Sequence, residues 1–368
     1  MKILILNWRD VKHPRAGGAD YRLQHVYAPL TRQGHEVILY SCAFPGCDAE
    51  DHIDGIEVHR LGNDVTFAFL CMLKLRSWVK KHQPDVVVED LNKLPFYSPL
   101  VYKGPLVIQM HHLWRKSIFR EAFFPVALLV WLSEEMIRLV YRKCRFSVVS
   151  ESTKRELEQM GVAPECIKTI YNGADLSRYQ PIEGEKEPYI IWIGRIQKYK
   201  GVLDACEVLE RLLPDFPKLK LIIVGDGPYK SRLEEYIERR GLQKKIRLTG
   251  FISEEEKISL LQRAAVHLQS SYKEGWGLSV IEANACGCPV VANNTTGLCD
   301  SVVDGESGLL YDYCNLDDAA NKVKSILSHS ELQVRLIENG FRRAAEFSWD
   351  RNSREMIEYL EQVIQESV

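Results

Sequence analysis

The sequence predicts an α/β protein of two domains, each with a parallel β-sheet flanked by helices. Short runs rich in β-branched residues alternate with longer helical patterns along the whole chain, which indicates parallel sheets with crossover helices. The chain has 368 residues, and two domains are expected because one hydrophobic core rarely serves more than about 250–300 residues. Apolar residues make up 46% and charged residues 27%, a globular composition that excludes a disordered or fibrous chain.

The predicted strands are short and recur in both halves of the chain. Residues 86–88 form a valine run of the kind that is buried on both faces of a parallel sheet. The Gly-Asp-Gly-Pro segment at 225–228 combines turn residues that end one strand and precede a helix. The predicted strands are residues 2–6, 36–40, 56–60, 85–89, 106–110, 146–149, 189–193, 220–224, 246–248, 266–269, 289–292 and 308–311. The predicted helices include residues 201–213, 229–240, 278–286 and 349–364.

Residues 181–188 form the predicted linker, because this Gly-, Glu-, Lys- and Pro-containing stretch has no apolar periodicity. The sequence thus predicts an N-terminal domain over residues 1–182 and a C-terminal domain over residues 183–348. The helical segment 349–368 follows the complete second set of strands, and we expect it to cross back and pack on the N-terminal domain. Open parallel sheets bind ligands at the carboxyl ends of their strands, which predicts a central cleft faced by both domains.

The overall charge excludes nucleic acid as a partner. The chain has 48 basic and 50 acidic residues, so its net charge is −2, whereas nucleic-acid-binding proteins carry a large basic excess. The charge is unevenly distributed, since residues 101–150 contain eight basic and three acidic side chains. That local excess matters for the partners considered below.

The cysteines and apolar runs bear on metal binding and cellular location. The ten cysteines include neither a Cys-x-x-Cys pair nor a histidine partner at zinc-site spacing, so we expect reduced cysteines, no metal and a cytoplasmic protein. The apolar run at residues 1–7 is too short for a signal peptide. The longest apolar run, residues 123–132, contains a proline and falls well short of the ~20 residues that span a bilayer. The protein is therefore expected to be soluble or peripheral.

Two carboxylates flank a turn that precedes a predicted helix. Glu274 and Glu282 are separated by seven residues, which begin with Gly-Trp-Gly. The free N–H groups of residues 275–279 at the helix start can bind an anion, and a carboxylate at each end can bind hydroxyl groups on either side of a diphosphate. The alternative is that Glu274 and Glu282 are solvated charges. The glycine-containing turn between them favours a binding site.

A basic loop follows the predicted strand 189–193. It begins with Gly194-Arg195 and ends with Lys200 before a second glycine. Arg195 and Lys200 are five residues apart across this loop, so both cations can approach one point and bind two phosphate groups. A solvated basic turn is an equally good interpretation of this segment alone.

Two further segments lie where predicted strands end. Gly17 and Gly18 precede the first helix, where they permit close approach of a ligand to the backbone. They do not form the dinucleotide-binding Gly-x-Gly-x-x-Gly pattern. His111 and His112 directly follow strand 106–110; a structural histidine is the usual case at such a position, and no carboxylate lies near them at the spacing of a metal site.

Taken together, these segments resemble the retaining glycosyltransferases of family 4, which have the GT-B fold and use nucleotide-diphosphate sugars. The resemblance extends over nearly the whole chain. The combination of Glu-x7-Glu with the Arg…Lys-Gly loop is its specific part. The matching segments are Gly17-Gly18-Ala-Asp, Gly34-His-Glu-Val37, Val149-Ser-Glu-Ser152, Asn172-Gly-Ala-Asp175, Gly194-Arg195…Lys200-Gly201, Val224-Gly-Asp-Gly-Pro228 and Glu274…Glu282-Ala.

The resemblance implies a role for each residue of the C-terminal motifs. Arg195 and Lys200 would neutralise the diphosphate as it leaves, Glu282 would bind the ribose hydroxyls and Glu274 would bind the transferred sugar. The main chain that contacts sugar and phosphate would be that of Gly275, Trp276, Gly277, Leu278 and Ser279.

The resemblance also implies roles for residues elsewhere in the chain. Gly17 or Gly18 would approach the phosphates, and Gly194 begins the donor-binding basic loop. His111 falls where the family has a strand-end histidine that faces the sugar, although His112 replaces a position that often holds Asp or Gly. Phe251 belongs to a segment whose backbone contacts the base.

The chemistry expected from this resemblance needs neither a metal nor another cofactor. Negative charge develops on the diphosphate as the bond to sugar C1 breaks, and fixed cations aimed at it lower the barrier. Retention through a covalent intermediate would need a nucleophilic carboxylate, for which the sequence offers no clear candidate. We therefore expect front-side displacement, in which the leaving phosphate helps to deprotonate the acceptor. A UDP-sugar is favoured over GDP-mannose as the donor.

The first domain is expected to bind the acceptor. Residues 88–96 and 111–119 look like a subgroup that acts in surface-polysaccharide and glycolipid assembly, which implies a glycan or lipid-linked acceptor. Residues 119–141 combine apolar bulk with the basic excess noted above, so residues 101–145 are a candidate for peripheral contact with an anionic membrane, at its inner face. The alternative is a core helix with a charged outer face.

Three other functions compete with a hexosyltransferase. A nucleotide-sugar 2-epimerase shares the fold and would convert its donor without an acceptor. An inactive sugar-nucleotide-binding homologue is the non-enzymatic alternative, which the intact set of motifs disfavours. A phosphorylase is disfavoured because no lysine lies in a context suited to a pyridoxal cofactor.

Overall fold

The computed structural model describes residues 1–91, 94–121 and 123–367, and it divides into two compact units. Unit 1 comprises Met1–Asn172 and Trp349–Val368, and unit 2 comprises Gly173–Ser348. The predicted α/β class with two parallel sheets is confirmed. The predicted boundary at 182/183 lies ten residues after the structural one at 172/173. Segment 173–182 belongs to unit 2 because its backbone and side chains bond there, for example from the Ala174 N–H to the Phe347 carbonyl at 3.2 Å.

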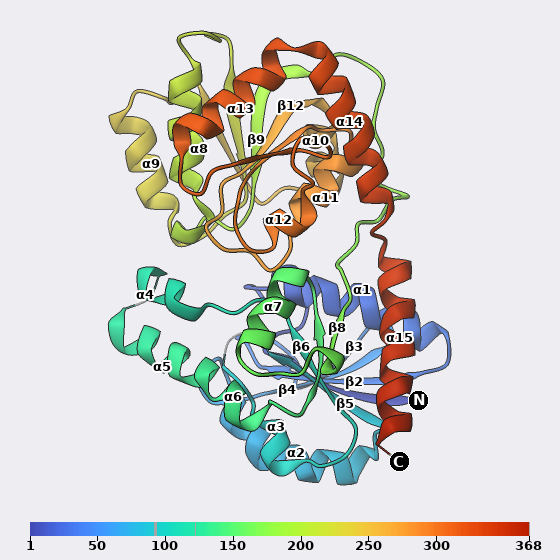
Figure 1. The fold of residues 1–368 in the computed structure, drawn as a ribbon. Coiled ribbons are helices and arrows are strands. Elements are labelled where there is room, and N and C mark those ends of the chain that lie inside the picture. The colour runs from blue at the N-terminus through green and yellow to red at the C-terminus, as the bar shows by residue number, and fades with distance from the viewer. Residues whose placement is uncertain (92–93, 122, 368) are drawn as a thin grey trace. The chain divides into compact units, whose positions relative to one another are not determined.

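Unit 1 contains an eight-stranded sheet in the order β3-β4-β2-β1-β5-β6-β7-β8 (Figure 1). All neighbouring strands pair in parallel except β3 and β4, which form an antiparallel hairpin. The strands are β1 (Lys2–Leu6), β2 (Glu36–Cys42), β3 (Glu50–Ile53), β4 (Ile56–Leu61), β5 (Val86–Leu91), β6 (Leu106–Met110), β7 (Arg145–Val148) and β8 (Ile167–Thr169). The helices are α1 (Gly18–Arg32), α2 (Phe67–His82), α3 (Ser98–Val101), α4 (Ile118–Glu121), α5 (Phe124–Glu135), α6 (Ile137–Val140), α7 (Glu151–Gln159) and α15 (Trp349–Glu366), with 3₁₀ turns at Arg115–Ser117 and Pro164–Cys166.

Two hydrophobic cores lie on the two faces of this sheet, because successive side chains of a strand point to opposite faces. Ile3 and Ile5 of β1 belong to a core shared with α1 and α15. Leu4 and Leu6 belong to the other core, which includes α2, α6 and α7. Both faces of β1 are therefore covered, as the continuous apolar composition of the strand requires.

Unit 2 contains a six-stranded, fully parallel sheet in the order β11-β10-β9-β12-β13-β14 (Figure 1). Its largest core packs α8, α9 and α13 against one face of the sheet. The strands are β9 (Glu187–Ile193), β10 (Lys220–Val224), β11 (Ile246–Gly250), β12 (Ala264–Gln269), β13 (Val290–Asn293) and β14 (Leu309–Tyr311). The helices are α8 (Val202–Leu212), α9 (Lys230–Arg239), α10 (Glu254–Arg263), α11 (Leu278–Ala285), α12 (Leu298–Ser301), α13 (Leu316–Ser328) and α14 (Ser330–Ala345), with a 3₁₀ turn at Lys198–Lys200.

All twelve predicted strands and the four predicted helices are present, and no bound differs by more than two residues. β3 and β8 were not predicted. Four residues, Asn92, Lys93, Ala122 and Val368, lie outside the described part of the chain. The first two fall in the predicted segment 88–96, the third in the predicted membrane-contact segment 101–145 and the last in the predicted helical segment 349–368. Within the described residues, no helix combines the length and apolar character that crossing a bilayer requires.

Candidate functional site

The basic loop of residues 194–200 follows β9 and is held by the loop that follows β10. The Gly194 N–H donates to the Val224 carbonyl at 3.1 Å, and the Ile196 N–H donates to the Asp226 carbonyl at 2.9 Å. Gly225 has φ +129°, and a Cβ atom there would lie 2.0 Å from the Gly194 carbonyl oxygen. Only glycine permits this approach of two backbones, so the Gly-Asp-Gly-Pro segment fixes the position of the basic loop.

Lys200 and Glu274 form an ion pair where the loops after β9 and β12 meet. The Lys200 Nζ atom lies 2.7 Å from Glu274 Oε1, and the two side chains are 17% and 14% exposed. Burial alone would lower the pKa of Lys200, but attraction to Glu274 and Tyr199 outweighs it, and the pKa lies above its ordinary value. The Arg195 guanidinium acts on the same ammonium by repulsion. The structure therefore brings Arg195, Lys200 and Glu274 together.

The start of α11 lies immediately after this pair. Gly277 is the N-cap residue, and Leu278 is the first residue of the helix. A Cβ atom on Gly277 would lie 2.5 Å from Ser301 Oγ, so a larger residue would displace the turn that presents the free N–H groups. The Trp276 side chain is buried and packs edge-on against Phe347 at 5.0 Å between ring centroids. Trp276 can therefore offer a ligand only its main chain.

Three polar side chains connect Glu274 to the sheet beneath it. Gln269 Nε2 lies 3.3 Å from both Glu274 Oε1 and Ser279 Oγ, and His267 Nε2 lies 3.3 Å from the same Ser279 hydroxyl. His267 is completely buried, and burial lowers its pKa to about 4, so the imidazole is neutral at pH 7. The carboxylate of Glu274 is thus positioned by a chain of hydrogen bonds as well as by Lys200.

Glu282 lies in the second turn of α11 and is held by a lysine of α10. Lys257 Nζ is 3.1 Å from both Glu282 carboxylate oxygens and 3.0 Å from Glu254. Glu254 also accepts a hydrogen bond from the Tyr179 hydroxyl. Burial raises the pKa of Glu282, and the Lys257 ammonium opposes that rise. Phe251, which follows the last residue of β11, is 84% exposed and accessible to a flat ligand.

In unit 1, the two predicted glycines stand at the start of α1. The Gly17 N–H donates to Asp20 Oδ2 at 2.8 Å, which completes the cap of the helix. Asn7 Nδ2 donates to the other Asp20 oxygen at 3.1 Å. Burial raises the pKa of Asp20 to about 6. Gly18 is exposed and no atom lies within 4 Å of the Cβ position there, so its backbone is the more accessible of the two.

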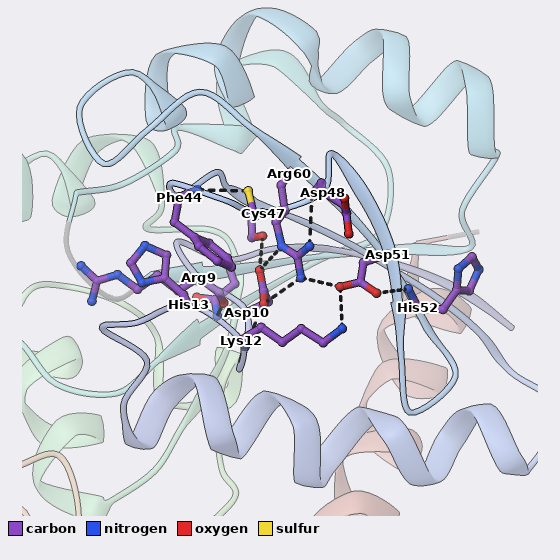
Figure 2. A network of polar contacts seen from close by, with 12 residues as sticks. Arg9, Asp10, Lys12, His13, Phe44, Cys47, Asp48, Asp51, His52 and Arg60 are labelled. Carbon is purple, nitrogen blue, oxygen red and sulfur yellow. Dashed lines mark hydrogen bonds and ion pairs between the residues drawn. The ribbon is translucent and has the colours of Figure 1, made fainter. Parts of the chain in front are cut away.

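A buried ion-pair network holds the loop between β1 and α1. Figure 2 shows the Arg60 guanidinium between Asp10 and Asp51. Arg60 donates to Asp10 at 2.8 and 3.1 Å and to Asp51 at 3.0 Å, and Lys12 donates to Asp51 at 2.8 Å. The Ser41 hydroxyl donates to Asp10 at 3.0 Å. The network ties the loop that precedes Gly17 to β2, β3 and β4.

His111 follows β6 and faces a carboxylate at the end of β5. Its Nε2 atom lies 3.0 and 3.1 Å from the two carboxylate oxygens of Asp90, and both residues are buried. His112 instead lies edge-on to Trp114 at 5.1 Å between ring centroids. The structure therefore distinguishes the two histidines, since the His111 ring faces a buried carboxylate and the His112 ring packs against an indole.

One group of metal-ligand type occurs among the described residues, formed by His13, Cys42 and Asp64. Asp64 already pairs with the guanidinium groups of Arg9 and Arg15. Because the only carboxylate of this group already pairs with two arginine side chains, the group is poorly suited to binding a metal cation.

Comparisons with known proteins identify the family. A family model described as "Glycosyl transferases group 1" matches residues 175–343, and one described as "Glycosyltransferase Family 4" matches residues 16–178. The chain is a family 4 glycosyltransferase. Its identity as an enzyme of this class, which the sequence motifs predicted, is thereby confirmed.

The glycosyltransferase is 27% identical over 398 aligned residues to a glycogen synthase of Mycobacterium tuberculosis (strain CDC 1551 / Oshkosh), which covers 95% of this chain and 92% of that protein. It superposes on sucrose-phosphate synthase from Thermosynechococcus elongatus with a TM-score of 0.84, 20% identity and complete coverage of both chains. It superposes on Anabaena HepE in complex with UDP-glucose with a TM-score of 0.79, 20% identity and coverage of 98% and 100%. The fold of the glycosyltransferase is therefore GT-B, as predicted.

Several residues that complete the site escaped the sequence analysis. Lys257 and Tyr179 are distant in the sequence from the groups they contact, and Gln269 precedes Glu274 by five residues but lies outside the motif. The spacing within a motif carries no information about such partners. A weak signal existed for Gln269, because it is the last residue of a predicted strand and therefore lies at the ligand-binding edge of the sheet.

Proposed function

We propose that this glycosyltransferase moves a hexosyl unit from a nucleotide-diphosphate sugar to a hydroxyl group of a glycan or lipid-linked acceptor, with retention and without a metal or other cofactor. The observation that carries the proposal is the Lys200–Glu274 pair at the start of α11, with Arg195 beside it. Cations next to free helix N–H groups bind a diphosphate, and a half-buried carboxylate beside them binds hydroxyls of the attached sugar.

In the proposed reaction, the bond between sugar C1 and the diphosphate oxygen breaks while the acceptor oxygen attacks from the same face. Arg195 and Lys200 stabilise the charge that develops on the diphosphate, which lowers the barrier because they act more strongly on the transition state than on the bound donor. The acceptor proton passes to the leaving phosphate oxygen. Glu274 orients the sugar, and Glu282, fixed by Lys257, binds the ribose hydroxyls.

The remaining predicted residues have supporting roles in this proposal. His111 binds a hydroxyl of the transferred sugar, and the accessible main chain of Gly18, beside Gly17, approaches the phosphates. Gly194 starts the basic loop, and Phe251 adjoins the base. The main-chain groups that contact the donor are those of Gly275, Trp276, Gly277, Leu278 and Ser279.

A thermal-shift panel of UDP, GDP, ADP and their sugar conjugates tests donor binding. UDP-glucose is the first donor to try, since HepE was solved in complex with it. A ligand at 100 times its dissociation constant stabilises the folded state by about 2.7 kcal/mol, so the preferred nucleotide raises the melting temperature clearly. No shift with any member of the panel would contradict the proposal.

The alternative functions are separated by product analysis. A transferase consumes its donor rapidly only with an acceptor, whereas an epimerase converts UDP-GlcNAc to a second sugar without one. Formation of free ManNAc or of its nucleotide conjugate from UDP-GlcNAc alone would favour the epimerase. Donor binding without turnover under any acceptor would indicate an inactive homologue.

We also propose that the segment around α5 contacts an anionic lipid surface, as a lipid-linked acceptor would require. Large apolar side chains are exposed there, with Phe123 and Leu139 each 77% exposed. Of the acidic residues of α5, Glu134 is buried and Glu135 pairs with Arg115 and Arg138. Exposed basic residues flank them on both sides. The exposed apolar residues are Phe119, Phe123, Phe124, Val126, Leu129, Leu132, Met136 and Leu139. The exposed basic residues are Lys116, Arg138, Arg142 and Lys143.

Vesicle flotation at low salt tests the lipid contact. The wild-type protein is expected to float with phosphatidylglycerol vesicles and not with phosphatidylcholine vesicles, and the variant Phe123→Ser/Leu139→Ser should lose binding. Val65→Ser is the matched control, because Val65 is 85% exposed in the same unit but outside this segment. Equal flotation of the double variant and the wild type would refute this surface, as would no binding by the wild type.

A further inference from the structure

The carboxyl ends of two neighbouring strands carry a buried histidine–carboxylate pair. β5 and β6 pair in parallel with Asp90 opposite Gln109, so Asp90 and His111 leave the same edge of the sheet. The His111 Nε2 atom lies at nearly the same distance from the two Asp90 oxygens, 3.0 and 3.1 Å. The His111 carbonyl also lies 3.4 Å from the Thr153 hydroxyl, which holds the backbone from the side of α7. His111 is therefore held at its ring by Asp90 and at its backbone by Thr153.

Two charged groups of α1 interact with the carboxylate of this pair. The Arg22 guanidinium is fully buried, and its Nε and Nη2 atoms have no hydrogen-bond partner among the described residues. Burial lowers the pKa of Arg22, and attraction to Asp90 opposes that change. Asp20 of the same helix repels Asp90. Asp90 thus interacts with a buried cation and with a second carboxyl group, and burying these charges costs free energy that packing alone does not require.

The pair determines which nitrogen of His111 carries a proton. A neutral imidazole has one N–H donor and one acceptor nitrogen, and an ionised carboxylate can only accept. Nε2 must therefore carry the proton that lies between His111 and Asp90. The remaining nitrogen, Nδ1, forms no hydrogen bond with any of the described residues and is left as an acceptor.

We propose that Asp90 is a positioning residue for the transfer reaction, which acts by holding His111 in the Nε2–H tautomer so that Nδ1 accepts a hydrogen bond from a hydroxyl of the bound sugar. The inference rests on the proposed function, because it assigns His111 a sugar hydroxyl as ligand. It adds the role of Asp90, the atom of His111 that meets the ligand, and the direction of that hydrogen bond. No proton is transferred in this role.

The tautomer is measured first, on the intact protein with ¹⁵N-labelled histidine, by long-range ¹H–¹⁵N correlation spectra. The His111 signals are assigned by their loss in His111→Gln. The wild type is expected to show the Nε2–H form, and Asp90→Asn should show the Nδ1–H form or a mixture. An Nδ1–H form in the wild type would overturn the inference whether or not any variant folds or any donor is turned over. That outcome is separate from the failure of the proposed function, which would be the absence of transfer.

Transfer kinetics then test whether the hold of Asp90 on His111 affects the reaction. Asp90→Asn should lower kcat/KM by about 10- to 100-fold, the value of a hydrogen bond that involves a charged group. The double variant Asp90→Asn/His111→Gln should be no slower than His111→Gln, because Asp90 acts through His111. Asp54→Asn is the matched control, an aspartate at a turn of the same unit with φ +49°. Unchanged kinetics in Asp90→Asn, or a further loss in the double variant, would overturn the inference; Asp90→Glu serves as the second variant if Asp90→Asn does not fold.

Discussion

Two cation–carboxylate pairs in the molecule have similar contact distances but different surroundings. In unit 1, Arg60 and Asp10 approach to 2.8 Å with both side chains 1% exposed. In unit 2, Lys200 and Glu274 approach to 2.7 Å with side chains 17% and 14% exposed. The first pair joins Asp10, in the loop after β1, to Arg60 within β4, whereas Lys200 and Glu274 both lie in segments that follow strands.

The difference lies in how many donors each cation has left. The nitrogens of Arg60 donate to Asp10, Asp51 and the Asp48 carbonyl. Among the described residues the Lys200 ammonium makes one hydrogen bond, to Glu274, although an ammonium group has three donors. A satisfied and buried cation holds a loop in place, whereas a half-exposed cation with unused donors can bind a ligand. The comparison supports a structural role for the first pair and agrees with the substrate-binding role proposed for the second.

The largest effect is expected from Arg60→Ala. The substitution leaves Asp10 buried without its partner, and breaking a buried ion pair in this way costs about 3–5 kcal/mol in unfolding free energy. Hydrogen exchange of β2 and β4 amides should report the loss within unit 1. Arg32→Ala, which removes an exposed arginine of the same unit, is the control. Equal protection in the two variants would contradict the structural role of the Arg60 network.

The next largest effect is expected from Lys200→Ala, on rate rather than stability. Loss of one group that stabilises charge in the transition state commonly lowers kcat by about 10²–10³-fold. Lys324→Ala removes a surface pair with Asp215 in the same unit and should leave the rate unchanged. If Lys200→Ala instead lowered the melting temperature and preserved turnover, the two pairs would have the same structural role and the comparison would fail.

The fold was largely predictable because its signals are local. The valine run of β5 and the turn at 225–228 each indicate an element from adjacent residues alone. The hairpin of β3 and β4 was missed, although Asp54 and Gly55 form the Asp-Gly turn that is typical of hairpins and both have positive φ. The surrounding parallel pattern concealed an antiparallel edge strand whose composition, Glu-Asp-His-Ile, has little β-propensity.

The site was predictable only as far as its motifs extend. Arg195, Lys200 and Glu274 were placed together because parallel strands bring their carboxyl ends to one edge. The partners that fix these residues come from other elements, as Lys257 of α10 does for Glu282. The Asp90 partner of His111 is likewise supplied by the neighbouring strand. Such pairings depend on side-chain directions that a single sequence does not encode locally.

A smaller effect is expected from His267→Gln in unit 2, and it changes the pH dependence of the unfolding free energy. The pKa of His267 is about 4 in the folded protein against an ordinary value of 6.5. Between these values the unfolded state binds a proton that the folded state does not, so unfolding free energy falls as pH decreases from about 6.5 to 4, by up to about 3 kcal/mol. His267→Gln should abolish this contribution, which hydrogen exchange of β12 amides at pH 7 and pH 4.5 would measure. If the variant showed the same pH dependence as the wild type, His267 would not be the neutral buried group that the structure indicates.

The smallest effect is expected from Lys12→Ala, at the exposed end of the Arg60 network. The Lys12 side chain is 53% exposed and pairs with Asp51 at 2.8 Å, and exposed pairs contribute about 0–1 kcal/mol, less at high salt. The hydrogen bond from Lys12, followed by that from Arg60, lowers the pKa of Asp51 to about 2. Asp51 therefore contributes stability above its ordinary pKa of 3.8, and this contribution is lost as pH falls through about 2. In Lys12→Ala the loss should begin at a higher pH but remain incomplete, because Arg60 still binds Asp51. A destabilisation as large as that of Arg60→Ala would mean that the network depends on its exposed lysine rather than on the buried Asp10–Arg60 pair.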